Sequence, residues 1–407
     1  MTLGSASTNA SATLPTADHE VRRLRLVVVA LAGTATLLKL VIAANTFGTD
    51  DVHYWTEFAQ GVRSFGPVGV YGHSFFAQYN HPPLAGWMLW ALNGLAGHHV
   101  ASFTFLIRAP ASIADLFTGV LVFELMRARR SARIAAASAV LVTWSPVLFV
   151  ISGFHGNTDP VFVMLTLLSL YLLVDRRRPF ASGVSLALAL SVKLVPVVVG
   201  PVFLLVLLRQ GGHRLVVFAR GFAVPMAILW GPVVATRWPE FRDNVLSYQG
   251  IWLRQWGLVQ FSQWVHGPTD FLVGSGRWIS LLLSAGLPAL LVWRHPDRHE
   301  TAIGLALVLF LLLSPAFGMQ YLAWPLAASY LVSFRFGTLY NLTASVFVVV
   351  VYGHWNGHRA PWDWHEAFSR PFDHREFVLM VVTWWSLAAV AAVALRVRSG
   401  SRPPSAS

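Results

Sequence analysis

The chain has 407 residues, of which 55% are hydrophobic and only 12% are charged. A soluble protein of ordinary composition carries about twice that charged fraction, so these values exclude a set of soluble domains and indicate a polytopic membrane protein. Cysteine is absent, which excludes disulfides, zinc–thiolate sites and cysteine nucleophiles. The net charge of +12 comes almost entirely from arginine, because the only lysines are Lys39 and Lys193.

The chain begins with a polar segment that has no apolar period, so residues 1–22 are predicted to be a disordered cytoplasmic tail. The apolar run over 24–44 then provides about the 20 residues that a helix needs to cross the hydrocarbon. It is too long for an ordinary signal peptide, and we interpret it as a membrane anchor. Further apolar runs follow at 105–126, 134–153, 159–175, 181–208, 215–235, 276–293, 301–315, 319–334, 338–352 and 377–395.

Arginine clusters separate many of these runs, and an excess of Lys and Arg marks cytoplasmic loops. All clusters fall on one side only if the run over 181–208 enters and leaves as two short helices, broken near Lys193 and Pro196. Both termini are then cytoplasmic, with about twelve crossings of the length that a bilayer requires. The positive charge is thus interpreted as a topology signal, and no nucleic-acid partner is expected.

The predicted fold is all-α: a polytopic membrane helix bundle of about twelve transmembrane helices, with amphipathic surface helices in the outer loops. The membrane domain is placed at 23–397, and 398–407 is a second cytoplasmic tail. The outer segments are 46–104, 152–159, 236–275 and 353–376. They hold most of the polar groups outside the spans, so the functional chemistry is expected to face outward.

The first outer segment opens with adjacent carboxylates, Asp50 and Asp51. A helix over 51–62 would place Tyr54, Phe58 and Val62 on one face and would lie on the membrane surface. One reading is that these acidic residues only cap the helix; the other is that one of them is a general base at the membrane boundary. Both roles are compatible, because a capping turn also fixes the direction of a carboxylate.

The same segment ends in Asn80-His81-Pro82-Pro83. Two prolines end an incoming helix and start the next one, and backbone N–H groups at such a start attract anions. The polar pair is therefore either part of a rigid loop or part of an anion site. The following stretch, 84–97, is too short to cross the membrane.

A polar turn and a lone lysine follow. His155, Asn157 and Asp159 lie in a tight turn between two spans, where Asp159 either caps the next helix or contributes to a site. Lys193 interrupts a long apolar stretch and stands three residues before Pro196. A cation at such a break either snorkels to the interface or binds a phosphate inside a cavity.

The later outer segments are rich in aromatic residues. Arg254 and Trp256 could form a site for a sugar phosphate, or could belong to an interfacial aromatic belt. Gln320 and Tyr321 open a late span. A histidine-rich loop over 354–365 could bind a divalent metal. Its histidines have no repeated ligand spacing, however, so neither a metal nor another cofactor is expected.

Two ionisable residues lie inside a span. Arg108 and Asp115 are two helical turns apart and are expected to form a structural ion pair or polar staple.

The order of these motifs resembles that of polytopic glycosyltransferases of the C superfamily, in particular a bacterial mannosyltransferase-like branch that uses polyprenyl-phosphate sugars. The shared features are an acidic residue after the first span, Asn-His-Pro-Pro-Leu, an outward Gly-Asn-Thr-Asp turn, a Lys before Pro in a broken span, and Gln-Tyr opening a late helix. The resemblance covers about residues 24–395. It implies transfer of a hexose, with mannose as the first candidate, to a glycolipid, glycan or protein acceptor outside a bacterial plasma membrane.

The resemblance also implies roles for the residues. Asp51 or Asp50 would deprotonate the acceptor hydroxyl for an inverting attack. The donor phosphate would bind Lys193, His81 and Arg254. The remaining candidates would bind the sugar or the acceptor: Tyr54, Asn80, His155, Asn157, Asp159, Trp256, Gln320 and Tyr321.

Two other classes are open at this point. A secondary transporter or lipid flippase would use the intramembrane Lys193, Arg108 and Asp115 as ion or substrate sites, although the two halves of the chain show no internal repeat. A scaffold protein would use the polar turns only as helix caps.

Overall fold

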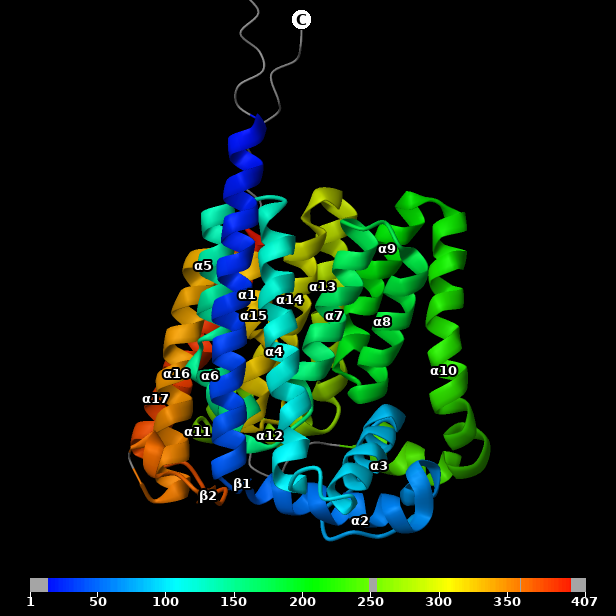
Figure 1. Cartoon of the computed structure of the whole chain (residues 1–407), viewed down its shortest axis with the longest axis vertical. Helices are drawn as coiled ribbons and strands as arrows, with labels where there is room; N and C mark the ends of the chain where they lie inside the picture. The colour runs from blue at the N-terminus through cyan, green and yellow to red at the C-terminus, as the bar shows by residue number, and fades with distance from the viewer. Residues whose placement is uncertain (1–13, 249–254, 359, 397–407) are drawn as a thin grey trace, which may run out of the picture.

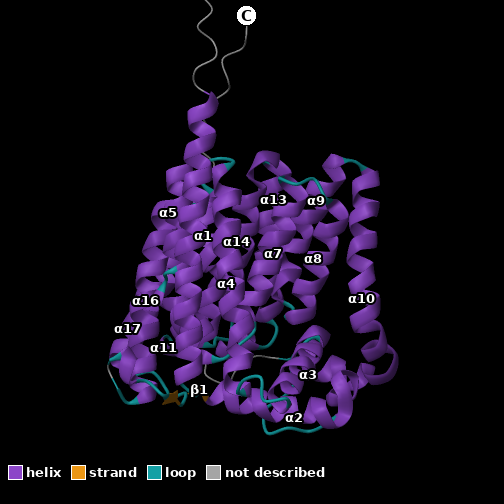
Figure 2. Ribbon diagram, viewed as in Figure 1, coloured by secondary structure: helices purple, strands orange, loops and turns teal. Residues whose placement is uncertain are grey.

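The computed structural model describes residues 14–248, 255–358 and 360–396 and is built almost entirely of helices (Figure 1). Figure 2 shows that the loops join the helices mainly at the two ends of a bundle. The helices of the bundle are α1 (Leu14–Asn45), α4 (Phe103–Arg127), α5 (Ala132–Thr143), α6 (Pro146–Leu148), α7 (Asp159–Val174), α8 (Pro179–Val192), α9 (Gly200–Gln210), α10 (Gly212–Phe241), α13 (Gly276–Arg294), α14 (His299–Leu312), α15 (Trp324–Val332), α16 (Phe334–Asn356) and α17 (His374–Leu395).

The predicted all-α membrane bundle is confirmed. Within the described residues, seven helical segments are long and apolar enough to cross a membrane, and α7, α8 and α9 are shorter apolar helices. α14 and α15 occupy the middle of the bundle and are buried along most of their length (Figure 1). A helix that is apolar on all sides is stable only when neighbours cover it, which explains this central position. The count of about twelve crossings stays a prediction.

The arginine-rich loops gather at one end of the bundle. Arg133 pairs with Glu20 at 2.8 Å, which links the start of α5 to the first turns of α1. Arg129 forms an ion pair with Glu300 at the start of α14, and Arg298 donates to the carbonyl of Ala394 at 2.9 Å. We call this end the arginine-rich end.

One boundary of the predicted tail is wrong. α1 begins at Leu14, inside the segment 1–22 that was expected to be disordered. The ion pair between Glu20 and Arg133 supports these first turns beyond the apolar run. Residues 1–13 and the expected tail 398–407 lie outside the described residues.

The predicted break at Lys193 is present. α8 ends at Val192, Lys193 has an extended backbone, and the short turn η3 (Val195–Val199) leads into α9. Both α8 and α9 contact α10, and the break lies away from the arginine-rich end (Figure 1). Proline at 196 has no N–H to donate, so a continuous helix through this point would be destabilised.

The opposite end carries a layer of short elements across the bundle. It contains β1 (Gly48–Thr49), α2 (Asp50–Gly69), η1 (Val70–Gly72), α3 (Pro83–Gly97), η4 (Arg242–Leu246), α11 (Gly257–Trp264), α12 (Thr269–Val273), η7 (Pro361–Asp363) and β2 (Glu366–Ala367) (Figure 1). We call this end the cavity end. The turns η5 (Pro296–Arg298) and η6 (Met319–Ala323) precede α14 and α15.

The surface helix expected over 51–62 is α2, and it starts as the sequence indicates. Thr49 is its N-cap and accepts a hydrogen bond from the backbone N–H of Asp51 at 3.3 Å. The helix buries Phe58 and Val62, whereas Tyr54 faces the cavity described below. β1 pairs in parallel with β2, with Thr49 opposite Ala367, which fixes the start of α2 against the last outer loop.

Candidate active site

A cavity of about 1180 Å³ opens at the cavity end, slightly larger than the roughly 300–1,000 Å³ of most small-molecule sites. Its walls come from α2, the loop before α3, the turn before α7, the break at Lys193, the start of α13 and η6. Most of the predicted site residues line it: Asp50, Asp51, Tyr54, Asn80, His81, His155, Asn157, Asp159, Lys193, Gln320 and Tyr321. Segments that are far apart in the sequence therefore line the same cavity.

Asp51 lies at the start of α2 with its side chain 29% exposed to the cavity. Its Oδ2 accepts hydrogen bonds from His155 Nε2 at 2.9 Å and from Gln320 Nε2 at 3.4 Å. Among the described residues, Oδ1 has no hydrogen-bond partner. This oxygen is therefore free to contact a ligand.

Asp50 has a different environment. The hydroxyl of Ser369 donates to its Oδ1 at 3.1 Å, and the backbone N–H of Ser369 lies 3.4 Å from Oδ2. Burial, and secondarily the charge of Asp51, raises the pKa of Asp50 above its ordinary value. Asp50 thus holds the last outer loop, and of the two carboxylates Asp51 is the one with an oxygen left for a ligand.

His155 is carried by η2 (Phe149–His155), a π-helical turn after α6, and π turns of this kind are frequent at functional sites. Thr49 Oγ1 donates to the backbone carbonyl of His155 at 2.8 Å, and Trp55 Nε1 donates to that of Gly156 at 3.0 Å. Gly156 adopts φ +88, which L side chains rarely adopt, and ends the turn. These contacts hold the turn against α2, so that His155 meets Asp51.

Lys193 and Asp159 form an ion pair at the same cavity. Lys193 Nζ is 2.6 Å from Asp159 Oδ1, and the Lys193 side chain is 23% exposed, while that of Asp159 is 2% exposed. Trp324 Nε1 donates to Asp159 Oδ2 at 2.7 Å. Both carboxylate oxygens are therefore engaged by protein groups, and Asp159 orients Lys193.

Aromatic rings surround the lysine ammonium. It lies 4.8 Å from the ring centroid of Tyr321 and 5.0 Å from that of Trp324, within range of cation–π attraction. The two rings stack on each other at 3.9 Å. Asp159 does not cap α7, because it is the first residue of that helix; Asn157 Oδ1 accepts a hydrogen bond from its backbone N–H at 2.8 Å.

His81 stacks on Trp55, with 4.2 Å between the ring centroids. Burial, and secondarily the nearby charge of Lys193, lowers the pKa of His81 from 6.5 to about 3. The imidazole is therefore neutral near pH 7, and its N–H can still donate a hydrogen bond. Neighbouring Asn80 and Tyr248 also line the cavity.

One predicted residue lies away from this site, and a second cannot be placed. Trp256 does not line the cavity: its indole N–H donates to the carbonyl of Leu311 at 2.8 Å, and its ring stacks on Phe317 at 4.4 Å. Its sugar-binding assignment is wrong, because packing with α14 and the loop before η6 uses the ring. Arg254 lies outside the described residues.

Arg108 and Asp115 do not form an ion pair with each other inside α4. The alternative expectation, a polar staple, describes Arg108. Arg108 donates to the carbonyls of Ala43 and Thr46, both at 2.7 Å, and so holds the end of α1. Asp115 pairs instead with Lys39 at 2.7 Å, and both side chains are almost fully buried. None of these groups lines the cavity.

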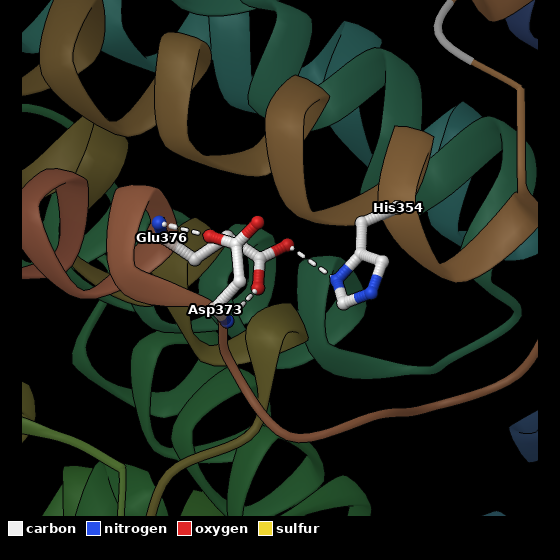
Figure 3. A group of neighbouring side chains, drawn as sticks. All are labelled: His354, Asp373 and Glu376. Atoms are coloured by element: carbon white, nitrogen blue, oxygen red, sulfur yellow. Dashed lines mark hydrogen bonds and ion pairs between the residues drawn. The ribbon is translucent and has the colours of Figure 1, made fainter.

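Among the described residues, one cluster of side chains that could hold a metal ion includes a histidine of the histidine-rich region. Ligand atoms of His354, Asp373 and Glu376 lie within 4.8 Å of one another (Figure 3). Glu376 Oε1 is bonded to His354 Nδ1 at 2.9 Å, and Glu376 with Asp373 forms the capping box of α17. We therefore assign this cluster to helix capping.

The sequence interpretation missed three residues of the site. Arg277, at the start of α13, lines the cavity, and its Nε is buried without a hydrogen-bond partner among the described residues. Trp324 holds Asp159, and Tyr352 contacts His155. An arginine before an apolar run was the only sequence signal for Arg277, and it resembles that of an ordinary interfacial anchor.

Comparison with known proteins adds to this geometry. Residues 80–236 match the model of a family described as dolichyl-phosphate-mannose-protein mannosyltransferase. This segment contains His81, Asp159 and Lys193. The resemblance to polytopic glycosyltransferases is confirmed.

One curated relative is GPI mannosyltransferase 1 from Debaryomyces hansenii, 28% identical over 139 residues, or 33% of this chain. The chain spans about a third of that relative, because the match covers 32% of it. A similar solved structure is ArnT from Cupriavidus metallidurans bound to undecaprenyl phosphate, with a TM-score of 0.49 and 15% identity. That similarity covers 90% of this chain and 76% of the other.

Proposed function

We propose that the protein is an inverting glycosyltransferase that transfers a hexose from a polyprenyl-phosphate donor to an acceptor at the outer face of the membrane. The observation that carries this proposal is the cavity itself, which places a carboxylate with one free oxygen and two cationic side chains around one space. Mannose is the first candidate sugar, because the matched family model and the curated relative are both described as mannosyltransferases.

The reaction follows from the charges. The acceptor hydroxyl attacks the anomeric carbon while Asp51 Oδ1 removes its proton, and the bond from that carbon to the phosphate oxygen breaks. The departing polyprenyl phosphate gains one negative charge. Lys193 and Arg277 stabilise this charge most strongly in the transition state, where it develops, and this differential stabilisation accelerates the reaction.

Neutral groups complete the donor site. The N–H of His81 and the ring of Tyr321 lie on the cavity wall with Lys193. Gln320 and Tyr54 line the same cavity and are proposed to bind sugar or acceptor hydroxyls. Arg254 is proposed as a further phosphate ligand on the sequence alone.

A transporter would need its intramembrane charges along a path through the bundle. Asp115 and Lys39 neutralise each other in a buried pair, and Arg108 is bonded to backbone carbonyls. These three groups lie outside the cavity. Their contacts favour a structural role, so the enzyme remains the better reading.

Transfer by the reconstituted protein tests the proposal. The wild-type protein in liposomes should move a radiolabelled sugar from a polyprenyl-phosphate donor to a glycolipid acceptor, and should not use a nucleotide sugar. A panel that includes mannosyl and glucosyl donors would identify the hexose. Transfer from none of the polyprenyl donors would contradict the proposal.

The orientation has its own test, because the chain contains no cysteine. Single cysteines can replace Trp362, which is 84% exposed at the cavity end, and Arg133, whose side chain is 82% exposed at the arginine-rich end. An impermeant maleimide should label Trp362→Cys in intact cells and Arg133→Cys only after lysis. The reverse pattern would place the cavity in the cytoplasm.

A further inference from the structure

A chain of three side chains runs inward from the cavity. His155 Nε2 is 2.9 Å from Asp51 Oδ2, and on its other side His155 Nδ1 contacts the hydroxyl of Tyr352. Tyr352 belongs to α16 and is fully buried, while the His155 side chain is 3% exposed. Three separate segments thus meet in one hydrogen-bonded line: α2, η2 and α16.

These contacts set the tautomer of His155. The Tyr352 hydroxyl has no other hydrogen-bond partner among the described residues, so its proton goes to Nδ1. Thr49 Oγ1 is also near Nδ1, at 3.4 Å, but its own proton goes to the backbone carbonyl of His155 at 2.8 Å. Since Nδ1 accepts, the ring proton is on Nε2 and points to Asp51.

The result is an asymmetric carboxylate. His155 and Gln320 both donate to Oδ2 of Asp51, which lines the cavity, and Oδ1 has no hydrogen-bond partner among the described residues. His155 cannot take a proton at Nε2 in this tautomer, because that nitrogen already carries one. Both ring nitrogens are engaged, so His155 is also a poor ligand for a sugar hydroxyl, the role expected from the sequence.

We propose that His155 is a positioning residue for Asp51, and that Tyr352 positions His155. This inference rests on the proposed function, and it assigns a role to a tyrosine that does not touch the substrate. During transfer the acceptor proton moves to Asp51 Oδ1 and no further. The donors on Oδ2 keep the carboxylate aimed at the acceptor oxygen, and such alignment is a large part of catalytic rate.

Steady-state kinetics on four variants tests this chain. Tyr352→Phe keeps the ring and should lower kcat by about tenfold, the equivalent of one lost hydrogen bond in the transition state, with little change in either KM. Tyr340→Phe is the matched control, since Tyr340 is a buried tyrosine of the same helix whose hydroxyl donates to the carbonyl of Leu322 at 2.8 Å. It should keep the wild-type kcat.

Replacement of the histidine gives an independent readout. His155→Ala should lower kcat by about a hundredfold, as expected when a reacting group is misplaced by about 1 Å. His155→Gln should recover part of that loss, because its amide N–H can still donate to Asp51. A merely structural histidine would show no such difference between Gln and Ala at equal thermal stability.

The possible failures can be told apart. If the wild-type protein transfers sugar and Asp51→Asn does not, a normal kcat in Tyr352→Phe overturns the positioning chain alone. Equal rates for His155→Gln and His155→Ala overturn it as well, even if the tyrosine variant does not fold. If the wild-type protein transfers nothing, the proposed function and this inference fail together.

Discussion

Lys193 and Asp159 meet across the cavity end of the bundle, with the lysine nitrogen 2.6 Å from the nearer carboxylate oxygen. One residue follows the last turn of α8, and the other starts α7. The indole N–H of Trp324 donates to the second oxygen of Asp159, so both carboxylate oxygens are held by protein groups. The cation of the proposed phosphate site is therefore held in place before any ligand binds, and such preorganisation favours catalysis.

A double-mutant cycle on this pair should reveal coupling. Lys193→Met should lower kcat/KM by about 10- to 100-fold, the value of one hydrogen bond to a charged group. Asp159→Asn should also lower kcat/KM, and the double variant should lose much less than the product of the two factors. The exposed Asp243→Asn is a control. Fully multiplicative losses would show that Asp159 does not act through Lys193.

Arg277 should affect mainly the binding of the donor. Its guanidinium lines the cavity and has a buried Nε without a described hydrogen-bond partner. Arg277→Ala should raise the donor KM by about tenfold or more, because a charged hydrogen bond to phosphate is lost. Arg242→Ala removes an exposed arginine and should change nothing. An unchanged donor KM in Arg277→Ala would exclude Arg277 from the phosphate site.

His81 should make the fold sensitive to acid. The pKa of its buried imidazole is lowered from 6.5 to about 3, so between these pH values the folded protein binds fewer protons than the unfolded chain. Stability should therefore fall as the pH drops through this window. His81→Gln cannot titrate there, so its melting temperature should fall less between pH 7 and pH 5 than that of the wild type or of His98→Gln, a variant at an exposed histidine. Parallel curves would contradict this assignment.

Local signals made much of the architecture predictable. The break after Val192 follows from a lysine and a proline within an apolar run, and the start of α3 follows from Pro82 and Pro83. Both features depend on the backbone chemistry of proline, which acts within a few residues. The gathering of the arginine-rich loops at one end follows from the positive-inside rule in the same way.

The partners of the site residues could not be predicted. Tyr352 lies in an apolar run, where a tyrosine has many structural roles, and it meets His155 only because α16 packs near η2. Asp115 forms its ion pair with Lys39 of α1 and not with Arg108 of its own helix. The sugar-binding role predicted for Trp256 was wrong for a related reason: a tryptophan that binds sugar and one that packs in a core have the same local sequence signal.

The choice between the two neighbouring acids tests the account most directly. Sugar transfer by the reconstituted wild-type protein, Asp51→Asn and Asp50→Asn should be compared with one polyprenyl-phosphate donor. Asp51→Asn should lose about 10²- to 10⁴-fold in kcat, the usual contribution of a general base. Asp50→Asn should lose about tenfold or less, because its amide oxygen can still accept from Ser369. Wild-type activity in Asp51→Asn, or the larger loss in Asp50→Asn, would contradict the account.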